Sequence, residues 1–125
     1  MNVKIDTKEK FFVITPQEPL LTVNMTEELG RLLLSCLEKP PFSLVLNLQA
    51  IDELSEEAAN QIVQTQQRFY EQNASFVICE IKPALENWLD EKDLLEMMNC
   101  TPTESEAWDI VQMEEIEREF LGDEE

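Results

Sequence analysis

The feature that most constrains the fold of this chain is a repeated alternation of short apolar runs with amphipathic segments. Two continuous apolar runs, Phe42–Leu48 and Ser75–Ile81, are typical of strands that are buried on both faces of a parallel sheet. Each run is followed by a segment with apolar residues at helical spacing. Because parallel neighbours are joined by crossover helices, this order predicts a mostly parallel sheet covered by helices.

The N-terminal segments add two strands and a helix to this pattern. Val3–Asp6 and Phe11–Thr15 predict a hairpin. The first helix is expected to begin at Asn24, which forms an Asn-x-x-Glu version of the capping box with Glu27. Pro40 should stop this helix, because proline cannot donate the backbone hydrogen bond that a helix interior needs.

The segments after the first buried run repeat the alternation. A helix is expected to run to about Glu71, a short helix to open at Pro83, and a third, shorter strand to cover Met97–Cys100. Thr103 forms another capping box with Glu106 and starts a last helix. We therefore predict an α/β fold, a mixed sheet of about five strands with about four helices packed on it.

One domain accounts for the whole chain, since no linker is long or polar enough to divide it. We expect residues 1–120 to form this domain and residues 121–125 to be a frayed acidic tail. The last helix is strongly acidic, because the chain from Thr103 onward has ten acids and one base. Its apolar residues Met113, Ile116 and Phe120 fit either docking on the sheet or recruitment of a partner.

The charge of the chain limits its partners. It carries 27 acidic and 9 basic residues, for a formal charge of −18. This field repels nucleic acids and anionic membranes, and it favours a basic partner or simple solubility. The N-terminus lacks the apolar core of a signal peptide, and no apolar run could span a bilayer. With Cys36, Cys79 and Cys100 as free thiols, these features predict a cytoplasmic protein.

Several kinds of catalytic and cofactor site are excluded by composition. The chain has no histidine, so histidine triads and histidine metal sites cannot form. Its two glycines do not begin a phosphate-binding loop, and no calcium-binding loop motif occurs. We therefore expect no enzyme activity, no cofactor and no metal site. A calcium-binding acidic surface and a homo-oligomeric scaffold, with contacts through Trp88 and Trp108 if they are exposed, stay as alternatives.

The stretch SEEA, Ser55–Ala58, lies between the first buried run and the helix that follows it. Ser55 is a natural N-cap, since its hydroxyl can accept a hydrogen bond from the first turn. Glu56 and Glu57 then lie where the helix dipole favours negative charge. Helix capping alone explains these residues without any function.

A resemblance to a known family adds a functional interpretation. LVLNLQAIDELSEEAANQI resembles the strand-loop-helix segment of the STAS domain, named for sulfate transporters and anti-sigma-factor antagonists. That segment typically reads V-V-L-D-L-S-G-V and then D-S-S-G. Asn47 falls on the strand's aspartate, Ser55 on the motif's aspartate, Glu56 and Glu57 on its two serines, and Ala58 on its glycine.

The end of the chain resembles the same family. DLLEMMNCTPTESEAWDIV is similar to its G-L-x-x-x-F-x-x-x-x-T-x-x-E-A segment, with Thr103, Glu106 and Ala107 at the last three named positions. The resemblance implies a STAS-like fold and partner switching, in which a kinase that is also an anti-sigma factor phosphorylates the motif's second serine. Glu57 has no hydroxyl, so this transfer is impossible here. Phosphorylation of the neighbouring Ser55 stays an alternative.

The resemblance implies a protein partner, either an anti-sigma factor of the kinase type or, as an alternative, a transporter ATPase that the domain regulates. Glu57 could be a permanent partial mimic of phosphate, or it could face a lysine or arginine of a co-adapted partner. The site could also be vestigial. We expect the partner to contact these residues: Asn24, Ser55, Glu56, Glu57, Ala58 and Gln61.

Overall fold

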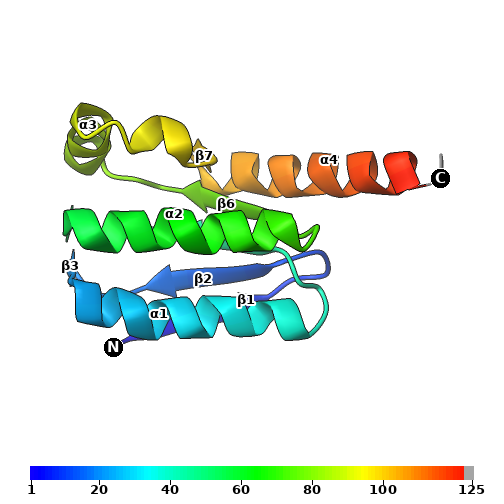
Figure 1. Cartoon of the computed structure of the whole chain (residues 1–125), viewed down its shortest axis with the longest axis horizontal. Helices are drawn as coiled ribbons and strands as arrows, with labels where there is room; N and C mark the ends of the chain where they lie inside the picture. Colours follow the sequence, from blue (N-terminus) through cyan, green and yellow to red (C-terminus); the bar gives the residue numbers. More distant parts are fainter. Residues whose placement is uncertain (123–125) are drawn as a thin grey trace.

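A five-stranded mixed sheet forms the centre of the computed structural model, which describes residues 1–122 (Figure 1). In sheet order its strands are β1 (Val3–Thr7), β2 (Phe12–Pro16), β4 (Leu44–Asn47), β6 (Phe76–Cys79) and β7 (Cys100–Thr101). β1 and β2 pair antiparallel as a hairpin, and all other neighbours are parallel. The predicted α/β fold with a mixed sheet is confirmed.

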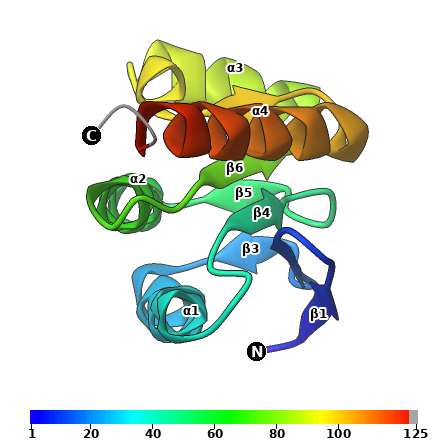
Figure 2. The same cartoon turned by 90° about the vertical axis from the view of Figure 1, so that its right-hand side faces the viewer.

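Helices cover both faces of this sheet (Figure 2). They are α1 (Val23–Ser35), α2 (Glu56–Glu71), α3 (Pro83–Glu91) and α4 (Glu104–Gly122), with the short 3-10 helices η1 (Cys36–Glu38) and η2 (Leu95–Met97). α1 and α2 pack side by side on one face, and α4 packs on the other. The predicted start of α3 at Pro83 and end of α2 at Glu71 are both confirmed.

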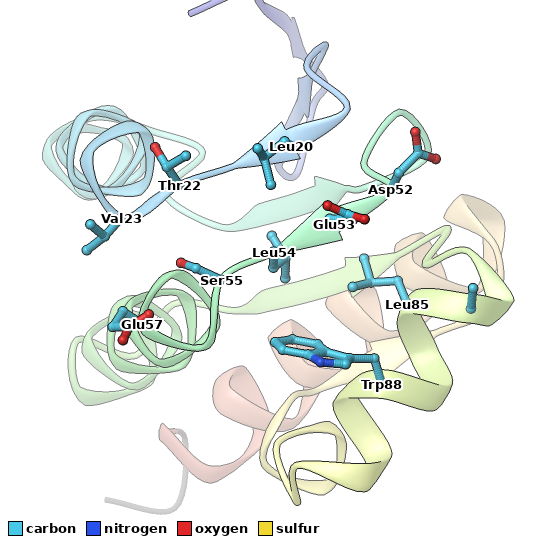
Figure 3. A pocket seen from close by; sticks show the side chains of 11 residues that line it. Leu20, Thr22, Val23, Asp52, Glu53, Leu54, Ser55, Glu57, Leu85 and Trp88 are labelled. Atoms are coloured by element: carbon cyan, nitrogen blue, oxygen red, sulfur yellow. The ribbon is translucent and has the colours of Figure 1, made fainter.

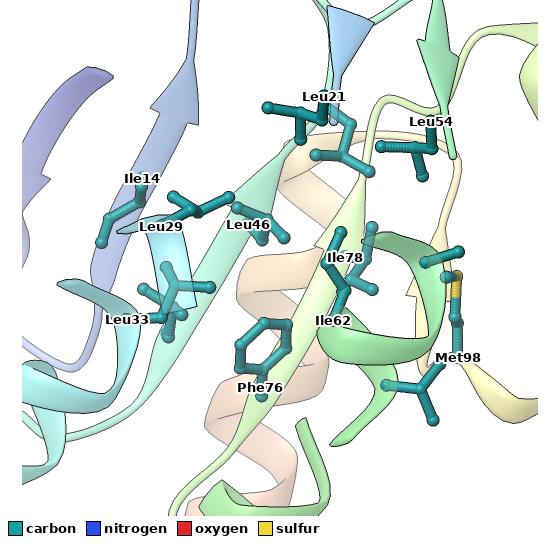
Figure 4. Close-up of a cluster of buried hydrophobic side chains, with 14 of the residues drawn as sticks. Ile14, Leu21, Leu29, Leu33, Leu46, Leu54, Ile62, Phe76, Ile78 and Met98 are labelled. Carbon is teal, nitrogen blue, oxygen red and sulfur yellow. The ribbon is translucent and has the colours of Figure 1, made fainter. Parts of the chain in front are cut away.

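The core is divided between the two faces by the alternation of side chains along each strand. Ile14, Leu46 and Ile78 occupy paired positions on neighbouring strands and pack with Leu29 and Leu33 of α1 (Figure 4). The positions one residue earlier face α4: Val13, Val45 and Val77. All six strand positions are buried, which explains why the sequence shows continuous apolar runs instead of alternation.

A second, two-stranded sheet lies at the ends of α1 and α2, and sequence analysis missed it. β3 (Leu20–Leu21) and β5 (Glu53–Leu54) are parallel, with Leu21 paired to Leu54. Strands of two residues carry no periodic signal, and only their tertiary pairing defines them. The pairing has one important consequence, because α1 and α2 begin directly after these two strands.

Two predicted boundaries were wrong. α1 is capped by Thr22 instead of Asn24, and the Thr22 hydroxyl accepts a hydrogen bond from the Met25 amide at 3.4 Å. Both residue types are good N-caps, and β3 ends at Leu21, so the chain turns into the helix earlier than expected. The expected strand at Met97–Cys100 is also shifted, because residues 95–97 form η2 and only Cys100–Thr101 pair with β6.

α4 packs on the sheet through its first half. Ala107 and Val111 are completely buried against the strands, whereas Met113, Ile116 and Phe120 are 58%, 64% and 65% exposed. Figure 1 shows α4 continuing beyond the sheet. Of the five residues expected as a frayed tail, 121 and 122 belong to α4, and 123–125 lie outside the described residues.

Candidate functional site

The start of α2 is capped as the sequence predicts. Ser55 has extended backbone angles, and its hydroxyl oxygen accepts a hydrogen bond from the Ala58 amide at 3.1 Å. The Ser55 amide donates to the Leu21 carbonyl at 3.2 Å, which ties the cap to β3. Ser55 is half-buried. Its hydroxyl therefore already has a structural role in holding the first turn of α2.

The next two residues present their carboxylates to solvent. Glu56 and Glu57 are both exposed in the first turn of α2. Within residues 1–122, no lysine, arginine or terminal amine forms a salt bridge with either carboxylate. The positive end of the helix dipole favours both charges. Each carboxylate is thus available to a cation from another molecule.

Ala58 and Gln61 contribute less exposed surface than expected. The Ala58 side chain is completely buried, so it offers no contact area to a partner. Gln61 is half-buried. Its side-chain oxygen is inaccessible to solvent and accepts no hydrogen bond within the described part of the chain. Gln61 can therefore contact a partner only through the remainder of its side chain.

The small sheet brings the starts of α1 and α2 together. Because Leu21 pairs with Leu54 in parallel, the following residues Thr22 and Ser55 lie next to each other, and each caps a helix. Asn24 is exposed in the first turn of α1, beyond this cap. Two helix N-termini thus open onto the same region of the surface.

A groove of about 680 Å³ lies beside the two helix starts (Figure 3). β3, β5, α3 and the first residues of α1 and α2 form it. Its lining residues are Leu20, Thr22, Val23, Asp52, Glu53, Leu54, Ser55, Glu57, Ala84, Leu85 and Trp88. No local sequence pattern predicts this groove, because only the tertiary fold brings residues of β3, β5 and α3 together around it. The exposed acids following the first buried run were its only visible signal.

Trp88 lies in the wall of this groove. Its indole is half-buried and packs against the hydrophobic core, which agrees with ordinary core packing. Its remaining surface faces the groove (Figure 3). Trp108 is also half-buried, packs near the α4 face of the sheet, and stacks with Phe11 at a centroid distance of 5.4 Å. Only Trp88 is therefore placed next to the helix starts.

The three thiols are poorly suited to nucleophilic chemistry at neutral pH. Cys36 and Cys79 are buried, and Cys100 is half-buried. Burial, followed by the charges of Glu104 and Glu80, raises the pKa of the Cys79 thiol to about 12. Burial also raises the pKa of Cys36 and of Cys100. A thiol that stays protonated is a weak nucleophile and a weak metal ligand.

In the described part of the chain, no three histidine, cysteine, aspartate or glutamate side chains come together as metal ligands would. None of the described helices combines the length and the apolar character that a bilayer crossing requires.

Comparison with known families and structures gives a consistent result. A sequence model of the STAS domain matches residues 2–107. Among the curated proteins, none is significantly similar to this chain. A putative anti-sigma factor antagonist from Thermotoga maritima superimposes with a TM-score of 0.77 at 15% identity, over 88% of this chain and 94% of its own.

Two other solved structures illustrate the range of proteins with this fold. RsbS from Moorella thermoacetica, in a variant with glutamate in place of a serine, has a TM-score of 0.73 at 20% identity, over 90% of this chain and 96% of its own. A murine anion transporter of solute carrier family 26 has a TM-score of 0.70 at 11% identity, over 86% of this chain and 18% of its own. At these identities the likeness is one of fold.

Proposed function

Because this chain belongs to the STAS domain family, we propose that it is a non-catalytic protein–protein interaction domain of the anti-sigma-factor-antagonist kind, in a bacterial cytoplasmic partner-switching pathway. The observation that carries this proposal is the start of α2. In the segment that resembles the family's phosphorylation motif, two exposed carboxylates have no cationic partner within the described residues. The contact surface consists of Ser55, Glu56 and Glu57, with Gln61 and Asn24 at its edges.

Glu57 gives this surface one fixed charge state. By the resemblance of SEEA to the family's motif, Glu57 falls on the serine that is phosphorylated, and it has no hydroxyl to accept a phosphoryl group. A phosphate would add about −1.5 to −2 charges at this helix start, whereas Glu57 supplies one. We propose that the partner has adapted to this charge and presents a lysine or arginine to it, so that binding does not require phosphorylation at this position.

Ser55 is a poor site for a switch of the usual kind. Its hydroxyl oxygen accepts the capping hydrogen bond from the Ala58 amide. A phosphoryl group on this oxygen would compete with the cap at the first turn of α2. Phosphorylation of Ser55 would therefore act on the stability of the helix start as well as on the partner.

A second candidate is a regulatory subunit of a transporter ATPase. A murine anion transporter contains a region with the same fold, which supports a link between this fold and transporters; the ATPase itself is part of the proposal. The same acidic surface would then contact the ATPase instead of an anti-sigma factor. The two candidates differ in the partner and share the contact surface.

A capture experiment with matched charge reversals tests both candidates. Tagged wild-type protein, Glu57→Lys and Glu71→Lys are incubated with lysate of the source organism, and the bound proteins are identified by mass spectrometry. Glu71 is the control, because it is exposed at the opposite end of α2. We expect wild type and Glu71→Lys to retain an anti-sigma factor of the kinase type, and Glu57→Lys to lose it. Equal retention by all three proteins would contradict the proposed surface, and a retained ATPase would select the second candidate.

A further inference from the structure

The groove beside the helix starts has an apolar floor. Leu54 and Leu85 are 5% and 3% exposed and form the bottom, where they also belong to the hydrophobic core. Val23 and Trp88 are half-buried on its walls, and Leu20 is 44% exposed at its rim. Leu20 therefore extends the apolar surface of the floor to the rim, where it forms one continuous apolar patch with Val23 and Trp88.

Acidic residues lie at both ends of this apolar surface. Figure 3 places Glu57 on the α2 side of the groove and Asp52 and Glu53 on the β5 side. Lys82 forms a salt bridge with Asp52. Within residues 1–122, Glu53 and Glu57 have no such partner. The groove therefore combines an apolar centre with an unneutralised carboxylate on each side.

We infer that this groove is the part of the interface that recognises the partner's sequence: it binds a basic segment that inserts one large apolar side chain between Leu20 and Trp88 and places lysine or arginine side chains beside Glu53 and Glu57. This inference rests on the proposed function and specifies the chemistry of the partner. Glu57 belongs to both the groove and the exposed start of α2, so the two surfaces are continuous.

The negative charge of the chain indicates which kind of molecule binds in the groove. The chain has a formal charge of −18, so a second copy would bring like charges together at this surface. A basic segment is attracted by the same field and neutralises the carboxylates of Glu53 and Glu57, which form no salt bridge within residues 1–122. Across the groove, Glu57 is followed by apolar surface and then by Glu53. A segment with an apolar side chain between two cations matches this order.

Selection of short random peptides on the full-length protein tests this inference without knowledge of the natural partner. Binding is measured by the fluorescence of Trp88 in a Trp108→Phe background, because Trp88 lines the groove and Trp108 does not. We expect the selected peptides to share a large aliphatic or aromatic residue with lysine or arginine close to it. They should shift the Trp88 emission, and Glu53→Lys should weaken their binding about tenfold.

The matched controls use exposed side chains, so that the variants keep the fold. Leu20→Ser should weaken peptide binding about tenfold, whereas Ile116→Ser should leave it unchanged. Both residues are exposed and apolar, and only Leu20 lies in the groove. Enrichment of no peptide, a consensus without basic residues, or binding that Leu20→Ser does not affect would each overturn the inference. A consensus that is apolar alone would indicate a neutral ligand instead.

Failure of this inference is distinguishable from failure of the proposed function. Leu20→Ser is added to the capture experiment beside Glu57→Lys. Loss of the natural partner with both variants supports the groove as part of the interface. Loss with Glu57→Lys alone would keep the start of α2 as the interface and overturn the role of the groove.

Discussion

At the scale of single residues, Ser55 shows how a functional surface is built on a structural requirement. Its hydroxyl holds the first turn of α2, and its amide is tied to the Leu21 carbonyl. Glu56 and Glu57 are thereby placed in the first turn of a helix whose dipole favours their charge. The capping interpretation and the functional interpretation of SEEA are compatible, since the cap positions the carboxylates.

Removal of the cap should lower stability. Ser55→Ala leaves the Ala58 amide without its side-chain acceptor, and we expect the free energy of unfolding to fall by about 1 kcal/mol. Ser55→Asp, which can cap in the same way, should stay close to wild type. Urea denaturation followed by circular dichroism measures both variants. A loss of similar size in both would show that the serine hydroxyl has another structural role.

Gly30 should be replaceable by alanine with a gain in stability. It lies inside α1, where glycine is less favourable than alanine because its unfolded state has more conformational freedom. A Cβ at this position would lie 3.8 Å from the Thr65 hydroxyl oxygen, an ordinary contact distance. We expect Gly30→Ala to raise the free energy of unfolding by about 0.5–1 kcal/mol. The unfolding free energy is measured by urea or thermal denaturation. A value lower than that of wild type would mean that α1 and α2 pack too closely for a methyl group.

At the scale of elements, the sequence predicts the helices and strands that a local pattern of residues specifies. The bounds of α2 follow from the Ser55 cap and an apolar stripe at helical spacing, and β4 and β6 follow from continuous apolar runs. β3 and β5 depend on the pairing of Leu21 with Leu54, which no local pattern specifies. The groove needs both this pairing and the placement of α3, so the sequence predicted the acidic helix start but missed the apolar surface beside it.

α4 combines two different attachments. Its first half packs through Ala107 and Val111, and its second half is held by polar contacts. The Tyr70 hydroxyl donates a hydrogen bond to the Glu114 carboxylate at 2.8 Å, and the Arg118 guanidinium donates to the Ser75 hydroxyl at 3.0 Å. These hydrogen bonds hold the second half of α4 in place, although the apolar residues of that half are exposed.

The two halves of α4 should therefore respond differently to truncation of an apolar side chain. Val111→Ala removes buried methyl groups and should lower the free energy of unfolding by about 1–3 kcal/mol. Ile116→Ala removes exposed ones and should change it by less than about 0.5 kcal/mol. Urea denaturation at two protein concentrations measures both effects. A large, concentration-dependent loss with Ile116→Ala would show that a second copy covers this part of α4.

At the scale of the whole molecule, the buried Cys79 thiol, beside the charges of Glu104 and Glu80, makes folding stability depend on pH in the alkaline range. The pKa of Cys79 is raised from its ordinary value of 9.0 to about 12 in the folded state. Between these values the unfolded chain releases a proton that the folded protein keeps. The contribution of the Cys79 thiol to the free energy of unfolding is therefore fully present below about pH 9. It is lost as the pH rises towards 12.

Measurement of the unfolding free energy as a function of pH checks this dependence. Between about pH 9 and 12, the Cys79 thiol should contribute a loss of about 1.4 kcal/mol in unfolding free energy per pH unit. Cys79→Ala should reduce the slope by this amount. Val77→Ala, at a buried position on the same strand without a titrating group, should lower stability and keep the slope. Identical slopes in wild type and Cys79→Ala would contradict the assignment.

The central claim is that the start of α2 is the surface through which this STAS domain contacts its protein partner. The most direct test is photo-crosslinking in the source organism, with benzoylphenylalanine in place of Asn60 or, as a control, of Glu71. Both positions are exposed on α2, and Asn60 lies one turn after Glu56, whereas Glu71 lies at the far end. The account predicts an adduct with one partner protein from position 60 and none from position 71. An adduct from position 71 without one from position 60 would contradict it.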